Sequence, residues 1–215
     1  NITYVEQDKP IGLPDAFILG EKFIKNDNVA LILGDNFFYG QNLSEKLRQL
    51  TTLKKGATIL LHKVKKPENY GVAKLDKNNQ ISKLVEKPKK FFSDLAVTGL
   101  YYFDNKVVRL SKKLRPSKRG EIEIIDLINE YKKLGELNGD VIGRGAAWLD
   151  TGTIDDFYKT SAFVEAIENR QGLKIACIEE IAFNNKWIGK KQITDSIKFY
   201  GNCEYSIYLK KLLNQ

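Results

Sequence analysis

The sequence predicts an α/β protein in which helices flank a mixed, mostly parallel central sheet. Residues 29–33 form a short and wholly apolar run, the composition of a strand buried on both faces, which is typical of mostly parallel sheets. A second apolar run at 57–61 predicts the next strand. Apolar residues recur at helical spacing over 13–25, and a further helix capped by Ser44 is expected over 44–54. Helix and strand therefore alternate, as in α/β proteins.

The later elements follow the same logic of periodicity and turn signals. Aromatic and β-branched residues mark one long strand, and residues 77–80 read as the turn of a hairpin. The expected ranges are 71–76 with 81–85 for the hairpin, 96–103 and 140–147 for strands, and 105–114, 121–134, 155–169, 179–183, 188–199 and 205–213 for helices. The strand at 140–147 is expected to deliver Asp150 into a loop, and Phe157 and Tyr158 to lie on the buried stripe of the helix at 155–169.

The chain is expected to form one domain, 1–215, with a mainly helical C-terminal part at 172–215. It opens without Met, and residues 2–5 read as a strand already in progress. We expect that a segment precedes the chain and that the domain is incomplete at its N-terminal end.

Composition excludes several classes of protein. Hydrophobic residues make up 42% and charged residues 29%, which is ordinary for a soluble globular protein. No apolar run approaches the roughly 20 residues that span a bilayer, and no signal peptide is evident, so we expect a cytoplasmic protein without membrane contact. The net charge is +8, but acidic residues separate most of the short lysine groups. The charge therefore favours attraction of a small polyphosphate over binding to nucleic acid.

Two aspartates are candidate metal ligands. Asp35 directly follows a predicted central strand, at the sheet edge where α/β proteins bind ligands, and Asp150 follows a later strand. Two such carboxylates can share a Mg²⁺ ion with phosphate oxygens and water. Each aspartate alone is equally consistent with an ordinary turn or helix cap.

A second candidate group is cationic and acidic together. Glu86 and Lys87 directly follow the hairpin, and Arg119 lies in the loop between two helices. A glutamate can accept bonds from sugar hydroxyls, and Lys or Arg can contact phosphate. A surface ion pair and a helix cap are the structural alternatives.

Other catalytic classes have little support. His62, the single histidine, lies inside an apolar strand pattern and reads as a core residue, which disfavours a Ser-His-Asp triad. Neither a P-loop nor a G-x-G-x-x-G motif occurs. Cys177 and Cys203 lack the spacing of a metal site.

Seven motifs in order along the chain carry a family resemblance. They are Gln7 with Gly12, Leu33-Gly-Asp-Asn36, Asn69-Tyr-Gly-Val72, Val85-Glu-Lys-Pro88, Ala96-Val-Thr-Gly-Leu-Tyr101, Arg119-Gly-Glu121 and Ala147-Trp-Leu-Asp-Thr-Gly152. The set resembles the glucose-1-phosphate thymidylyltransferases among the sugar nucleotidyltransferases. The resemblance implies a Rossmann-like nucleotide-diphospho-sugar transferase fold and a homo-oligomer, often a tetramer in the family.

The resemblance also implies an enzyme that joins dTTP to glucose 1-phosphate with Mg²⁺, giving dTDP-glucose for deoxysugar and polysaccharide biosynthesis. The implied roles fall into four groups: metal ligands Asp35 and Asp150; thymine contacts Gln7 and Gly12; sugar-pocket residues Tyr70, Gly71, Glu86 and Val97; and phosphate contacts Lys87 and Arg119. A second, regulatory nucleotide site is implied around Tyr39, Gly40, Gly143 and Glu180 in the stretch 179–182.

One family feature is absent from the sequence. The glycine-rich loop that wraps the triphosphate in family members does not occur, so the chain as given is expected to lack its main phosphate cradle and to be inactive alone. Two rival functions stay open: a uridylyl- or cytidylyltransferase acting on a sugar 1-phosphate, and a noncatalytic chain that binds sugar nucleotides.

Overall fold

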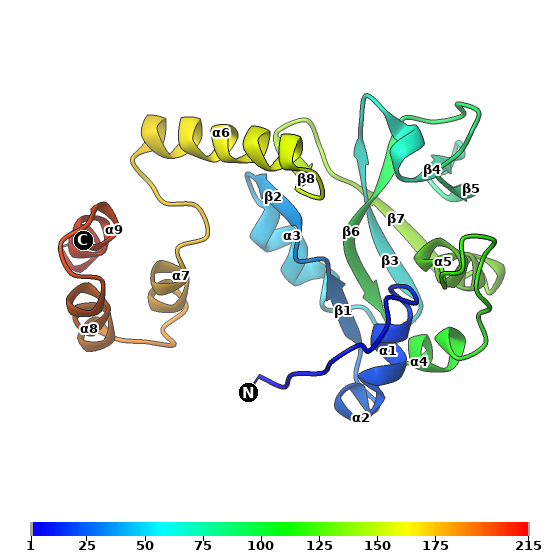
Figure 1. Cartoon of the computed structure of the whole chain (residues 1–215), viewed down its shortest axis with the longest axis horizontal. Coiled ribbons are helices and arrows are strands. Elements are labelled where there is room, and N and C mark those ends of the chain that lie inside the picture. Colours follow the sequence, from blue (N-terminus) through cyan, green and yellow to red (C-terminus); the bar gives the residue numbers. More distant parts are fainter. Residues whose placement is uncertain (1, 215) are drawn as a thin grey trace. The chain divides into compact units, whose positions relative to one another are not determined.

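The computed structural model describes residues 2–214 (Figure 1). Its elements, in chain order, are α1 (Asp15–Leu19), α2 (Glu21–Ile24), β1 (Val29–Ile32), β2 (Asn36–Gly40), α3 (Leu43–Leu50), β3 (Ala57–Lys63), the 3-10 turn η1 (Pro67–Asn69), β4 (Gly71–Leu75), β5 (Ile81–Glu86), β6 (Leu95–Phe103), α4 (Lys106–Ser111), α5 (Ile124–Lys133), β7 (Leu137–Val141), β8 (Ala146–Asp150), α6 (Ile154–Gln171), α7 (Ile178–Asn184), α8 (Lys190–Tyr200) and α9 (Glu204–Leu213). None of these described helices is long and apolar enough to cross a membrane.

The chain divides into two compact units, the first ending at Asp150 and the second beginning at Thr151. The first unit contains the sheets and the second is helical. The helical region therefore begins earlier than residue 172, although the expected helices at 179–183, 188–199 and 205–213 are all present within it. That the two units make one domain stays a prediction.

The six-stranded sheet is organised around β6, its longest strand. One edge of β6 pairs with β3, while the other edge is shared by β4, near Ala96, and β1, near Tyr102. Beyond these strands, β5 pairs with β4 and β7 pairs with β3. The hairpin and the long aromatic strand expected from the sequence are confirmed.

The α/β class and the mixed sheet are confirmed, and the strand directions explain how the sheet is mixed. The antiparallel and parallel pairings together give β1, β3, β4 and β7 one direction and β5 and β6 the other. Because β6 is inserted between strands that share a direction, only β3 and β7 pair directly in parallel. The sheet is mostly parallel in strand direction but not in its neighbouring pairs.

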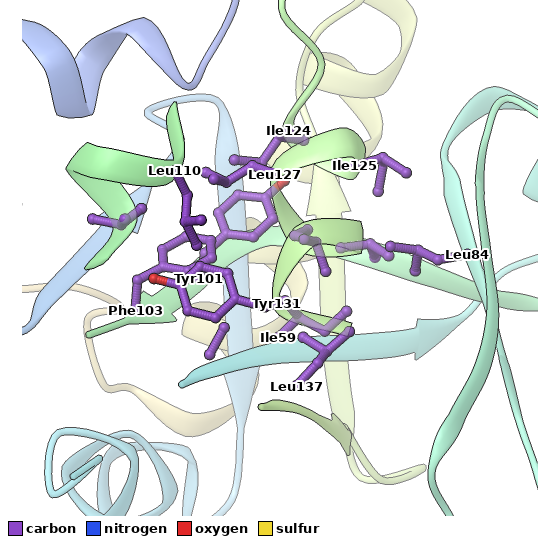
Figure 2. Close-up of a cluster of buried hydrophobic side chains, with 14 of the residues drawn as sticks. Ile59, Leu84, Tyr101, Phe103, Leu110, Ile124, Ile125, Leu127, Tyr131 and Leu137 are labelled. Atoms are coloured by element: carbon purple, nitrogen blue, oxygen red, sulfur yellow. The ribbon is translucent and has the colours of Figure 1, made fainter. Parts of the chain in front are cut away.

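Side chains that alternate along β3 and β6 supply apolar surface to both faces of the sheet. On one face, Ile59 and Phe103 pack with buried side chains of α1, α4 and α5 (Figure 2). On the other face, Leu60 and Tyr102 pack with Ile142 and with the apolar side of α3. The result is a layered α/β arrangement in which both faces of the central strands are covered.

Aromatic rings form the centre of the larger core. Phe103 is fully buried, and its ring meets Phe17 edge-on at 5.3 Å and lies 5.4 Å from Tyr131 between centroids. Figure 2 shows Tyr131 of α5 beside Tyr101 and Phe103 of β6. The Tyr131 hydroxyl donates to the buried Asp104 carboxylate at 2.9 Å, so the polar end of this ring is satisfied.

A two-stranded ribbon of β2 and β8 stands apart from the main sheet and was not expected from the sequence. The strands pair antiparallel from Asn36 opposite Asp150 to Gly40 opposite Ala146. Every residue of β2 is half-buried, so the strand shows no alternation by which it could be recognised. Asp150 is the last residue of β8, which corrects its expected placement in a loop.

Two other expectations at the N-terminal side are wrong. β1 is not buried on both faces: its burial alternates, and Ile32 is 58% exposed. Among the described strands, β1 pairs with β6 alone. Residues 2–5 form no strand, and Tyr4 is 89% exposed. A strand requires a hydrogen-bonding partner, and none of the described strands pairs with this segment.

Helix starts and burial also differ in detail. The N-cap of α3 is Asn42 in the left-handed region, with no side-chain cap bond, so Ser44 is not the cap. The N-cap of α6 is Thr153, whose hydroxyl accepts from the Asp156 N–H at 3.1 Å. The expected stripe of α6 is not buried at its start, where Phe157 is 58% and Tyr158 69% exposed.

The second unit has a core of its own. Leu209 and Ile193 are fully buried, and Cys177 is 2% exposed among the side chains of α8 and α9. Its thiol lies 3.1 Å from the Tyr205 hydroxyl, while Cys203 is exposed. The two cysteines are free thiols.

We predict that Phe103→Ala lowers the free energy of unfolding by about 3–5 kcal/mol, because truncation leaves a cavity among rings that cannot close on it. Phe91→Ala is the matched control, since Phe91 is 76% exposed and should change stability little. Urea denaturation followed by circular dichroism measures both. A small effect at Phe103 would show that this ring is not central to the core.

Candidate active site

The β2–β8 ribbon brings the two candidate metal ligands together. Asn36 lies directly opposite Asp150, and Asp35 immediately precedes Asn36. Residues opposite each other in an antiparallel pair lie about 4.5–5.5 Å apart between Cα atoms, and Asp35 is one residue from the direct partner of Asp150. Asp35 and Asp150, although 115 residues apart in the sequence, are therefore neighbours at the same end of one ribbon.

The charges of three carboxylates act on the buried side chain of Tyr101. Burial is the main cause that raises the pKa of Tyr101, and the negative charges of Glu86, Asp35 and Asp150 raise it further, in that order. The charges of the expected metal ligands and of the expected sugar-pocket glutamate therefore act on one side chain. Asp35 and Asp150 come from the ribbon, Glu86 from the end of β5, and Tyr101 from β6.

Glu86 has an unusual electrostatic environment. Burial is the largest cause that raises the pKa of its carboxyl above the ordinary value, and the Glu123 charge adds to it. Lys87 and Arg119 act in the opposite direction, and Asp126 contributes a smaller increase. An acidic group with a raised pKa at a site edge is a common feature of ligand-binding centres.

Arg119 lies between two carboxylates. Its guanidinium nitrogen Nη1 is 3.8 Å from Glu86 Oε1 and 3.7 Å from Glu123 Oε1. The Ser117 hydroxyl donates to the same Glu123 oxygen at 2.9 Å and accepts from the Arg119 N–H at 3.1 Å. The structure thus brings Arg119 to Glu86. Its role as a phosphate contact stays a prediction, and the N-cap of α5 is Glu123 rather than Arg119.

The turn after β5 is anchored to the β4 side of the hairpin. The Lys87 N–H donates to the Tyr70 carbonyl at 3.0 Å, and Lys87 has a positive φ of 41°. The Tyr70 ring meets Trp148 of β8 at 5.1 Å between centroids. This contact joins the hairpin to the strand that carries Asp150.

Gly71 leaves room beside the Glu86 carboxylate. A Cβ at this position would lie 3.1 Å from Glu86 Oε2 and 2.5 Å from Ile125 Cδ1. Any side chain at residue 71 would therefore press on α5 and crowd the carboxylate. The Tyr-Gly pair expected in the sugar pocket is placed next to Glu86.

Gln7 and Gly12 also come together. The Gln7 amide donates to Asp15 Oδ2 at 2.8 Å and to the Gly12 carbonyl at 3.4 Å. Gly12 has φ +124°, and a Cβ there would lie 2.1 Å from the Ile122 carbonyl oxygen. The Ile122 N–H donates to Ile11 at 2.7 Å, so this turn lies against the segment that follows Arg119.

The positions of Val97 and of the expected regulatory residues do not follow the pattern of the other site residues. Val97 is 6% exposed and belongs to the large hydrophobic core, so its part in a sugar pocket stays a prediction. Gly143 lines a cavity of about 380 Å³ beside α3, together with Ala146, the partner of Gly40 in the ribbon. Tyr39 lies next to Gly40 in β2, whereas Glu180 belongs to the helical unit and accepts a bond from Tyr208 at 2.7 Å.

The residues present fit a Mg²⁺ ion bound by two carboxylates. Among the described residues, no group of three or more His, Cys, Asp or Glu could hold a metal by itself. Magnesium in nucleotide sites usually takes one or two carboxylates and completes its shell with phosphate oxygens and water. Asp35 and Asp150 supply such an incomplete set, which a phosphate ligand would complete.

A sequence profile of the Nucleotidyl transferase family matches residues 1–167, which include every residue of this site. The chain belongs to this family. This chain is 44% identical over 215 residues to the glucose-1-phosphate thymidylyltransferase of Neisseria meningitidis serogroup A. The alignment covers 100% of this chain and 75% of that relative. The resemblance found in the motifs is thereby confirmed.

Solved structures agree with this assignment. A Bacillus anthracis protein assigned as a glucose-1-phosphate thymidylyltransferase, in complex with a sucrose, is 40% identical with a TM-score of 0.67 over 75% of this chain and 64% of that chain. A UDP-glucose pyrophosphorylase complexed with UDP-glucose is 25% identical, also with a TM-score of 0.67, over 76% and 66%. The fold expected for a nucleotidyl transferase is confirmed.

Sequence reasoning missed two residues of the site. Tyr101 and Trp148 both belong to the family motifs but were given no role, although Trp148 packs on Tyr70 and lies 6.3 Å from the His62 ring. Trp148 is 7% exposed, and an aromatic residue two positions before a candidate ligand on the same strand points to the same face. That period of two was the available signal.

We predict that Glu86→Gln stabilises the nucleotidyl transferase more at about pH 7 than at about pH 4. Because the folded state raises the Glu86 pKa above its ordinary value of 4.5, the folded wild type holds this proton more tightly than the unfolded chain. Its free energy of unfolding therefore falls as pH rises through that window, and the glutamine variant avoids this loss. Urea titrations at both pH values, with Glu68→Gln as an exposed control, measure the difference; a larger gain at the lower pH would contradict it.

Proposed function

We propose that the nucleotidyl transferase transfers a thymidylyl group from dTTP to glucose 1-phosphate, giving dTDP-glucose and pyrophosphate. The names of its curated relatives support this reaction. The observation that carries it is that Asp35 and Asp150 meet at one end of the ribbon, that their charges and that of Glu86 act on the same buried tyrosine, Tyr101, and that Arg119 lies at Glu86. One centre thus offers carboxylates for a metal, a carboxylate for sugar hydroxyls and a cation for phosphate.

The reaction is a displacement at phosphorus. An oxygen of the sugar 1-phosphate forms a bond to the α-phosphorus of dTTP, while the bond from that phosphorus to the bridging oxygen of the β-phosphate breaks. Pyrophosphate leaves with the electron pair of the broken bond. The protein contributes by holding the two phosphates in line and by balancing charge, rather than by covalent chemistry.

The sugar 1-phosphate half of the site is formed by the end of β5 and the loop before α5. Glu86 accepts bonds from the sugar hydroxyls, Tyr70, Gly71 and Val97 line the pocket, and Lys87 and Arg119 contact the phosphate. The cations near Glu86 support this arrangement, because their charges already act on its carboxyl and can balance an anionic substrate bound beside it. Binding of the phosphate would replace the long contacts of Arg119 with its carboxylate neighbours.

The nucleotide half has two parts. Asp35 and Asp150 would hold Mg²⁺, which supplies charge stabilisation for the phosphate oxygens when bound. Gln7 and Gly12 would meet the thymine, and the tight turn that brings them together supports their joint action. A backbone carbonyl and an amide are the groups that can distinguish one base edge from another.

Base preference defines the alternative function. The 25% identity to a UDP-glucose pyrophosphorylase with the same fold supports a uridylyltransferase as the second candidate. The higher identity to the thymidylyltransferases favours thymidine.

The cavity beside α3 is proposed as part of a second, regulatory nucleotide site with Tyr39, Gly40 and Gly143. Its lining by Gly143 and by Lys46, whose ammonium pairs with Asp140 at 2.7 Å and would have to exchange that partner for a phosphate, is compatible with that role. For Glu180, in the helical unit, the regulatory role stays what the family resemblance implies. A cytoplasmic location, a homo-oligomeric assembly and use of the product in deoxysugar and polysaccharide biosynthesis complete the proposal.

We predict that Asp150→Asn lowers turnover roughly 100-fold or more, because the substitution removes a charge that the metal requires. The assay measures pyrophosphate released from dTTP and glucose 1-phosphate with Mg²⁺ by the intact gene product. Asp27→Asn, at an exposed bend, is the control and should leave turnover unchanged. Unchanged turnover in Asp150→Asn would refute the metal assignment.

We also predict that dTTP is the preferred nucleotide when it competes with other nucleoside triphosphates, UTP and CTP among them, for glucose 1-phosphate. Nucleotide sugars formed in the mixture are separated and quantified by mass spectrometry. A product dominated by UDP-glucose or CDP-glucose would replace the thymidylyl assignment with the alternative function. The absence of any nucleotide sugar would favour a noncatalytic binding protein.

A further inference from the structure

Asn36 lies where the ribbon, the main sheet and the candidate metal ligand meet. Its side-chain oxygen Oδ1 accepts from the Gly99 N–H at 2.9 Å and from the Trp148 indole N–H at 2.6 Å. Its nitrogen Nδ2 donates to Asp35 Oδ1 at 2.8 Å. We infer that Asn36 is a positioning residue that holds the Asp35 carboxylate in place for its ligand, an inference that rests on the proposed function.

The surroundings determine which way the Asn36 amide is turned. A backbone N–H and an indole N–H can only donate hydrogen bonds, so both must face the amide oxygen. The amide nitrogen is then directed to the opposite side, where Asp35 Oδ1 lies. The two donors thus oblige Asn36 to present an N–H to the carboxylate, and no other residue type of this size offers two acceptor contacts and one donor contact at once.

The protein has a close-fitting place for this side chain. A Cβ added at Gly99 would lie 2.5 Å from Asn36 Oδ1 and 2.6 Å from its Cγ, so glycine at residue 99 is required for Asn36 to sit against β6. Trp148, the second donor, is 7% exposed and packs against Tyr70. Asn36 is therefore held from two strands, while Asp35 itself is exposed.

An exposed carboxylate has several rotamers in water, and a ligand must select one of them. A charge-assisted bond from a rigid neighbour reduces that choice before the ligand arrives. Outer-shell partners of metal-binding carboxylates characteristically change metal affinity or activity by 10- to 100-fold when they are removed.

A purely structural role is the alternative, because Asn36 also satisfies two buried donors. Asn36→Asp separates the two roles: it keeps an acceptor for Gly99 and Trp148 but replaces the donor to Asp35 with a carboxylate oxygen. The exposed Asp35 can then turn into solvent, so folding is preserved while the carboxylate is misdirected. Asn36→Leu, of similar size, loses both the acceptor and the donor.

The experiment compares melting temperature and turnover of the wild type, Asn36→Asp and Asn36→Leu in the intact gene product. We expect the melting temperature of Asn36→Asp to stay nearer to wild type than that of Asn36→Leu. We expect turnover to fall about 10- to 100-fold in both, with Asn36→Asp at least as impaired as Asn36→Leu. Turnover losses that follow the order of the melting temperatures, or near-normal turnover in Asn36→Asp, would overturn the positioning role.

Binding of Mn²⁺, followed by electron paramagnetic resonance below the melting transitions and in the presence of dTTP, gives a readout that is independent of turnover. We expect the dissociation constant to rise about 10-fold in Asn36→Leu, and binding to be lost in Asp35→Asn. Unchanged binding in Asp35→Asn would refute the proposed metal site. Loss in Asp35→Asn with unchanged binding in Asn36→Leu would overturn only the role of Asn36.

Discussion

The pairing of β2 with β8 is the constraint on which the site depends. This ladder joins segments more than 100 residues apart and fixes Asn36 opposite Asp150. A slip of one residue would turn every side chain of one strand to the other face, separating Asp35 from its partner. The contact of Trp148 with Tyr70 then ties the same ribbon to the hairpin that carries Glu86. One short antiparallel pair of strands therefore positions both the expected metal ligands and the residues expected to bind the sugar.

In this centre the positive charges of Arg119 and Lys87 lie near the negative charges of Glu86 and Glu123. Glu86 is held partly buried near Glu123, which raises its pKa, while Arg119 and Lys87 oppose that effect. An anionic substrate would enter a region where cations are already opposed by carboxylates. Such a site keeps its side chains oriented before the ligand binds. Holding the Glu86 carboxylate partly buried lowers the stability of the fold, and Glu86→Gln measures this cost.

Much of the fold could be predicted because the pattern of apolar residues along its central elements follows their burial. The aromatic run of β6 and the helical spacing of α4 and α5 reflect a core that covers them on the inner side. The predictions failed where burial depends on what lies opposite in space. β1 is apolar like a central strand but exposes Ile32, and β2 is half-buried without alternation. Periodicity carries no information about such neighbours.

The sequence by itself determined the α/β class, the family motifs and the types of residue available for chemistry, because these follow from local periodicity and from the order of residues along the chain. Only the tertiary structure decided that Asp35 and Asp150 are neighbours, that Tyr101 lies among their charges and that the Asn36 amide faces Asp35. Those relations arise from strand register and from donors on distant strands. No local pattern specifies them, since hydrogen bonds between segments form only after the chain has folded.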